Sequence, residues 1–195
     1  MLRKLYDKTL ALARSRYAVP ALGGVAFTES FIFPIPPDVI LLPMMFAQTK
    51  TGDAYKRVRI WWLAGFATLC STLGAGVAYI LGALAWDIVS PLVGGEAAYA
   101  QFQTTYASYG VWVVLVAAIS FIPFKLATLA SGALGAPIVP FIAAAFIGRG
   151  IRFFLLATLV YFFGRDIIAN IEKYFTTLSW VVLALALISI YLIWA

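Results

Sequence analysis

Three prolines and an acid interrupt the first long apolar run, at Phe33-Pro34-Ile35-Pro36-Pro37-Asp38. Proline lacks an amide proton and clashes with the preceding turn, so a helix that reaches this motif must break. A second break follows at Phe121-Ile122-Pro123-Phe124-Lys125, and the two motifs align as Ile-Pro-Pro-Asp with Ile-Pro-Phe-Lys. This pattern predicts two pairs of half-helices whose tips meet, at Pro34, Pro36, Pro37 and Pro123.

The composition places these apolar runs in a bilayer. The chain has 195 residues, of which 64% are apolar and 11% charged, and its mean hydropathy is +0.97. A soluble domain is typically about half apolar and a quarter charged. Broken backbone at membrane depth is tolerated only where protein or a water-filled cavity covers it. We therefore expect an all-α polytopic membrane protein, with residues 17–195 forming a single membrane domain.

Histidine is absent and Cys70 is the only cysteine. No disulfide can form within the chain, and no zinc or haem site can be built from histidine and cysteine. We therefore expect no cofactor and no metal. The net charge is +6, but the basic residues lie mostly at helix ends and in short loops, which favours anionic lipid over nucleic acid as a partner.

The flanking charges predict how the first apolar run sits in the membrane. Residues 1–16 form a basic segment with helical apolar spacing, typical of an interfacial amphipathic helix on the cytoplasmic surface. Residues 50–59, after the run, are basic as well. Because both flanks belong on the cytoplasmic side, and the prolines leave arms too short to cross, residues 17–48 should enter and return as a re-entrant hairpin.

The second half repeats this plan. We expect a crossing at 60–86, a second re-entrant hairpin at 111–136, a crossing at 139–164 and a last crossing at 178–195. Within the first two crossings, Leu73-Gly-Ala-Gly-Val-Ala-Tyr79 matches Ile147-Gly-Arg-Gly-Ile-Arg-Phe153. Each half is then a broken hairpin followed by a spanning helix. Because the two hairpins enter from opposite sides, the halves form an inverted repeat.

Five ionisable residues fall within predicted membrane segments: Glu29, Asp38, Lys125, Arg149 and Arg152. A charge at the centre of a membrane helix costs roughly 2.5–3.5 kcal/mol, so these charges must be paired, hydrated or neutralised. We expect Asp38 to pair with Lys125, because both stand at hairpin tips. Two acids against three cations leave one positive charge, which suits a lipid phosphate.

Each charge also has a simpler explanation. Asp38 could cap its half-helix, and Lys125 could extend to the interface. Glu29 could be a buried neutral acid, which is also what a proton-coupled step requires. Arg149 and Arg152, three residues apart on one helix face, either pair with the two acids or clamp a phosphate, whose oxygens arginine binds bidentately.

The combination of Glu29 with the Pro-Ile-Pro-Pro-Asp break, the Ile-Pro-Phe-Lys tip and the run from Gly148 to Phe154 resembles the DedA family. This is a branch of the VTT or SNARE-associated superfamily, and its YqaA-like members are the most similar. The resemblance implies a multi-pass protein of the bacterial inner membrane with two re-entrant hairpins. It also implies lipid translocation or scrambling, with carrier-lipid recycling and proton dependence, and it places the essential acids at Glu29 and Asp38.

These observations predict a lipid translocase or scramblase that binds phosphate through Lys125, Arg149 and Arg152. Glu29 and Asp38 would serve as proton-coupling groups or charge partners, and the lipid would be an anionic phospholipid or a polyprenyl phosphate. The alternative is a proton-coupled transporter of a small ion or solute, and homo-oligomerisation is open. We do not expect an enzyme, because Ser120 and Ser131 lie off the helix face of Lys125. A purely structural protein would leave the five charges unexplained.

Overall fold

The computed structural model describes residues 17–31, 36–49, 54–89, 95–120 and 124–164. Within these ranges every regular element is a helix, and two of the helices are long and apolar enough to cross a membrane. The prediction of an all-α membrane protein is confirmed. The amphipathic helix predicted at 1–16, the last crossing predicted at 178–195, and the tip prolines Pro34 and Pro123 lie outside the described residues.

The first hairpin consists of α2 (Ala18–Thr28) and α3 (Asp38–Thr49). Their 11 and 12 residues reach about 16–18 Å at about 1.5 Å per residue, roughly half of a hydrocarbon core of about 30 Å. At the start of α3 the carbonyl of Pro37 accepts the amide of Leu41, at 2.9 Å. The proline thus begins the second arm instead of extending the first.

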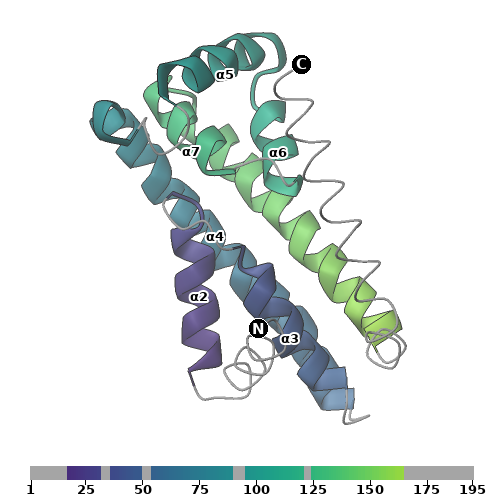
Figure 1. The fold of residues 1–195 in the computed structure, drawn as a ribbon. Coiled ribbons are helices and arrows are strands. Elements are labelled where there is room, and N and C mark those ends of the chain that lie inside the picture. The colour runs from purple at the N-terminus through teal and green to yellow at the C-terminus, as the bar shows by residue number, and fades with distance from the viewer. Residues whose placement is uncertain (1–16, 32–35, 50–53, 90–94, 121–123, 165–195) are drawn as a thin grey trace, which may run out of the picture.

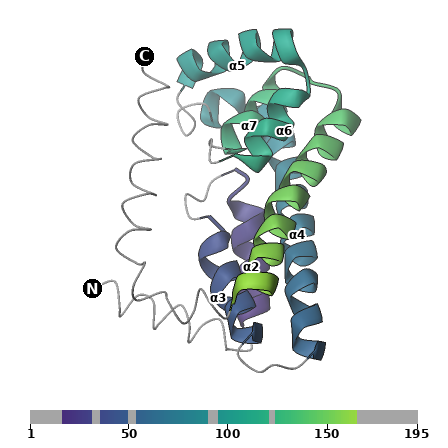
Figure 2. The same cartoon turned by 90° about the vertical axis from the view of Figure 1, so that its right-hand side faces the viewer.

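The second hairpin has the same plan. It consists of α6 (Trp112–Ile119) and α7 (Phe124–Ala133), both shorter than a membrane is thick. It is preceded by α5 (Gly95–Tyr109), which is bent by 117° relative to α6. Figures 1 and 2 show the two hairpins approaching from opposite ends of the molecule, with α5 lying across one end.

Two long helices run past both hairpins: α4 (Ala54–Val89), with its apolar part at Val58–Ile88, and the helix Ile138–Gly164. Each hairpin has its own apolar core, and both long helices contribute to both cores. Phe153, in the second half, is buried in the core of the first hairpin. Tyr79, its counterpart in the repeated motif, packs against the core of the second hairpin. The two halves therefore exchange equivalent aromatic side chains.

The glycines that begin the repeated motif also occupy equivalent places. A methyl group at Gly74 would overlap the backbone carbonyl of Phe27 in α2. A methyl group at Gly148 would stand 2.5 Å from the Cβ of Ala118 in α6. In each half the missing side chain lets the spanning helix touch the first arm of its own hairpin. This shared contact gives the sequence repeat a structural basis.

Candidate functional site

Glu29 closes the first arm of the first hairpin. It follows directly on α2, where its amide donates to the carbonyl of Val25. Its carboxylate forms an ion pair with Arg149 of the helix Ile138–Gly164. The Arg149 side chain is 1% exposed and that of Glu29 is 17% exposed. The pairing compensates the burial of two charges, each of which would be costly alone.

Asp38 opens the second arm of the same hairpin. It is the first residue of α3, where a negative charge is stabilised by the helix dipole. Its Oδ2 accepts a hydrogen bond from Nη2 of Arg152 within an ion pair. The capping role and the pairing role considered for Asp38 therefore coexist.

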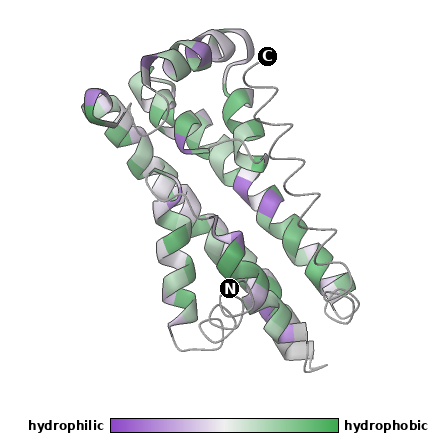
Figure 3. Cartoon of the chain, in the orientation of Figure 1, coloured by the Kyte–Doolittle hydropathy of each residue, from purple (hydrophilic) through white to green (hydrophobic). Residues whose placement is uncertain are grey.

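Both arginines also contact the second hairpin. The guanidinium of Arg149 lies 4.3 Å from the centroid of the Phe124 ring, at the start of α7, in a cation–π contact. Nη1 of Arg152 donates to the carbonyl of Ser120, at the end of α6, at 2.8 Å. Each arginine thus joins one arm of the first hairpin to one arm of the second. Figure 3 shows the hydrophilic interruption midway along the otherwise apolar helix Ile138–Gly164.

The expected pair between Asp38 and Lys125 is wrong. Asp38 and Glu29, the acids predicted within the membrane, both pair with arginines, which leaves Lys125 without an ion pair in the described part of the chain. Lys125 is half-buried in the first turn of α7. Asp38 and Lys125 are equivalent in the repeat, but the long side chain of Arg152 reaches Asp38 instead.

The charged site is asymmetric although the backbone is repeated. In the aligned motifs, Ala75 and Ala78 of α4 stand where the second half has Arg149 and Arg152. Both alanines are fully buried. No cation of α4 therefore stands at the positions equivalent to the two arginines.

Hydroxyl groups connect the same region and were not predicted from the sequence. Ser30, next to Glu29, donates to the carbonyl of Ser71 in α4 at 2.9 Å. Thr128 of α7 lies 3.0 Å from the carbonyl of Lys125 and 2.8 Å from that of Ser30, with its hydroxyl oriented to donate to either. Serines and threonines in an apolar run signal little by themselves. The sequence indicated their importance only by position, because Ser30 follows Glu29 directly and Thr128 lies one helical turn after Lys125.

Apart from the two atoms of the Glu29–Arg149 ion pair, two buried polar atoms of the site have no hydrogen-bond partner among the described residues: Oδ1 of Asp38 and Nε of Arg149. Buried polar groups are normally satisfied, so the site retains capacity for a proton, water or a polar ligand group. Among the described residues, no group of three His, Cys, Asp or Glu side chains could hold a metal ion. Pro36 and Pro37 stand just before α3, Pro36 exposed and Pro37 buried.

Two half-membrane hairpins that enclose buried opposite charges between spanning helices define a polytopic membrane protein of the transporter type. The family model of the VTT domain matches residues 35–162. The chain belongs to this family, which is also called the DedA family.

Proteins similar to this chain occur in Haemophilus influenzae and Histophilus somni. An uncharacterized protein of Haemophilus influenzae is 34% identical over 192 residues, covering 97% of this chain and 96% of that protein. An uncharacterized protein of Histophilus somni is 32% identical over the same length, with the same coverage. No solved structure matches the chain.

Proposed function

We propose that this protein moves a phosphate-bearing lipid across the bacterial inner membrane, through the site formed by Lys125, Arg149 and Arg152. The observation that carries the proposal is that Arg149, which is buried, and Arg152, which is partly buried, lie midway along a spanning helix and contact both hairpins. Arginine binds phosphate oxygens bidentately. A headgroup in this site would therefore be held between Glu29 and Asp38 of the first hairpin and Ser120 and Phe124 of the second. The basic flanks of the first apolar run favour a cytoplasmic N-terminus.

The charges of the site suit a single anionic headgroup. With Glu29–Arg149 and Asp38–Arg152 closed, the pairs are neutral, and among the described residues of the site Lys125 supplies one positive charge without an ion pair. A phosphodiester carries one negative charge and would balance it. Lys125 also stands at the N-terminal end of α7, where the helix dipole favours an anion. An anionic phospholipid or a polyprenyl phosphate meets this requirement.

Binding of the headgroup by the arginines would require an exchange of partners. Arg152 already donates from both terminal nitrogens, to Asp38 and to the carbonyl of Ser120. A phosphate that takes over this two-nitrogen contact must displace the carboxylate from Nη2. Protonation of Asp38 or Glu29 would weaken the hold of the carboxylate on its arginine and favour this exchange. The mechanism thus couples uptake of a proton to capture of a phosphate.

The test is lipid movement in vesicles that contain the purified protein and a fluorescent phospholipid. We expect faster exchange between leaflets for anionic lipid than in protein-free vesicles. Arg152→Lys should keep the fold but lose most of the acceleration, because lysine cannot reproduce the bidentate contact. Correctly inserted protein that accelerates neither anionic phospholipid nor lipid phosphate would exclude the proposal.

A second candidate is a proton-coupled transporter of a small ion or solute. The unpartnered Oδ1 of Asp38 favours it, because this oxygen can accept a proton without breaking an existing hydrogen bond. This candidate predicts a substrate-dependent pH change in vesicles that persists when both arginines are replaced by lysine. The change should disappear in Glu29→Gln. The lipid proposal predicts loss of transport in both cases.

A further inference from the structure

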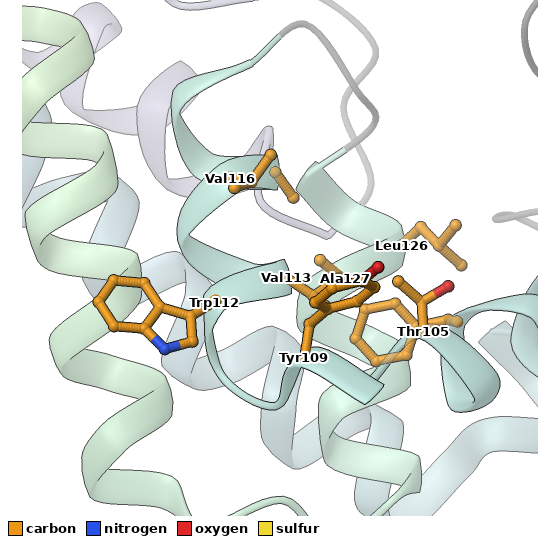
Figure 4. Close-up of a pocket in the computed structure, with 9 residues that line it drawn as sticks. Thr105, Tyr109, Trp112, Val113, Val116, Leu126 and Ala127 are labelled. Carbon is orange, nitrogen blue, oxygen red and sulfur yellow. The ribbon is translucent and has the colours of Figure 1, made fainter. Parts of the chain in front are cut away.

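A cavity of about 300 Å³ lies between α5, α6 and α7, outside the charged site. Figure 4 shows side chains from the three helices gathered around it. The walls are almost entirely hydrocarbon and aromatic. The lining residues are Phe102, Thr105, Tyr109, Trp112, Val113, Val116, Ala117, Leu126 and Ala127. We refer to it below as the α5–α7 pocket.

The bend between α5 and α6 creates this space. Gly110 has φ +58°, a conformation that glycine adopts without strain, and it lets α5 turn by 117° away from α6. On either side of the bend, Tyr109 and Trp112 are each 67% exposed. Tyrosine and tryptophan concentrate at the level of lipid headgroups. The two exposed rings therefore indicate that this side of the pocket lies near one membrane interface, just beyond which the lipid chains begin.

The pocket complements the charged site. In the register that aligns Asp38 with Lys125, the lining residues Val116 and Ala117 correspond to Glu29 and Ser30. The position that is acidic in the first hairpin is therefore apolar in the second. A molecule that binds both at the charged site and in the α5–α7 pocket needs one charged end and one hydrocarbon end.

Charge complementarity identifies the kind of molecule. Leu126 and Ala127, in the pocket wall, directly follow Lys125, which has no ion pair in the described part of the chain. The lysine has a flexible four-carbon stem and three donors for an anionic group. An uncharged hydrocarbon would leave this cation uncompensated. A small inorganic anion would leave the pocket unused.

We propose that the α5–α7 pocket binds one hydrocarbon chain of an anionic membrane lipid whose phosphate contacts Lys125. This rests on the proposed function and names the substrate's two contact points: an anionic headgroup at the lysine, and a chain held by the second hairpin. The protein would then select a lipid both by the charge of its headgroup and by the fit of its hydrocarbon chain in the pocket. The headgroup alone would not determine binding.

Photo-crosslinking tests the pocket independently of transport. The full chain is placed in nanodiscs with a trace of a phosphatidic acid that carries a photoactivatable group on one acyl chain, and labelled peptides are identified by mass spectrometry. We expect labelling concentrated in 102–127. A phosphatidylcholine with the same chain should label these residues several-fold less, because it bears no net charge. Lys125→Gln should remove most of the difference between the two lipids, and Lys125→Arg should retain it.

A matched pair of variants controls for general lipid contact. Val116→Phe fills the pocket at a residue that is 54% exposed, and should lower pocket labelling several-fold. Val58→Phe makes the same change on α4, at a residue that is 65% exposed and outside the pocket, and should leave labelling unchanged. Thr105→Phe, which fills the pocket from α5, gives a second measurement should Val116→Phe fold poorly.

Labelling that follows exposed surface along the whole chain, or that is equal in Val116→Phe and the wild type, would overturn the inference. Loss of pocket labelling with an unchanged transport rate would also overturn it, since the bound lipid would then be a resident one. Pocket labelling that behaves as expected, in a protein that moves no lipid in vesicles, would uphold the binding site and contradict the proposed function instead.

Discussion

The hydroxyl of Thr128 lies 2.8 Å from the carbonyl of Ser30, which stands 98 residues earlier in the chain, and is oriented to donate a hydrogen bond to it. Ser30 follows Glu29 beyond α2, and Thr128 lies one turn after Lys125 in α7. The two hairpins are therefore joined directly to each other as well as through the arginines.

Thr128→Val tests this bond with little change in shape. Thr128 is fully buried, and loss of its hydroxyl leaves the Ser30 carbonyl without this donor. We expect destabilisation of about 1–3 kcal/mol, measured by reversible unfolding in bicelles. Thr128→Ser keeps the hydroxyl and should lose less. Equal stability of all three proteins would show that the bond contributes nothing.

The Glu29–Arg149 pair should behave as a unit. Arg149→Met leaves Glu29 buried without its cation, and should destabilise the protein by roughly 3–5 kcal/mol. Glu29→Met combined with Arg149→Met removes both charges, and should recover most of that loss while abolishing transport. The measurement is a double-mutant cycle on unfolding free energy. Additive effects of the two substitutions would contradict the pairing.

Lys125→Ala should leave stability unchanged or raise it. The lysine holds neither acid in place, and its removal relieves the cost of a half-buried charge. In the vesicle assay, however, the ratio of anionic to zwitterionic lipid movement should fall several-fold. A severe folding defect in Lys125→Ala would mean that the lysine has a structural partner after all.

Glycine substitutions test the close contact between helix α4 and the first hairpin. Gly74→Ala places a methyl group against the backbone carbonyl of Phe27. We expect impaired folding, seen as loss of monodisperse protein in detergent, because backbone on both sides cannot easily move. Gly24→Ala is the matched control in α2, where a methyl group meets nothing within 4 Å. It should be neutral or stabilising by about 0.5–1 kcal/mol.

The sequence predicted the broken hairpins and the charged residues for clear physical reasons. Closely spaced prolines remove successive backbone donors and clash with the preceding turn, so Pro36 and Pro37 mark the start of an arm, whereas the single Pro43 is accommodated within α3. An acid such as Glu29 in an apolar run is costly enough to demand a partner. Both signals are local, and neither depends on how the chain packs.

The choice of partners could not be predicted in the same way. Asp38 and Lys125 have equivalent places in the repeat, but equivalence by symmetry does not bring two side chains together. Arg152 reaches Asp38 because the helix Ile138–Gly164 packs beside the start of α3 and the end of α6, which is a property of the packing. Phe124 is one of 15 phenylalanines, and nothing in the sequence distinguishes it as the ring that contacts Arg149.

The uneven distribution of charge between the repeats has a consequence for biogenesis. Of the predicted intramembrane charges, the first half holds the acids Glu29 and Asp38, and the second half holds the cations that pair with them, Arg149 and Arg152. During synthesis the acidic half leaves the ribosome first, before Arg149 and Arg152 have been made. The two ion pairs can form only after the second half has inserted, so the charged site is completed last.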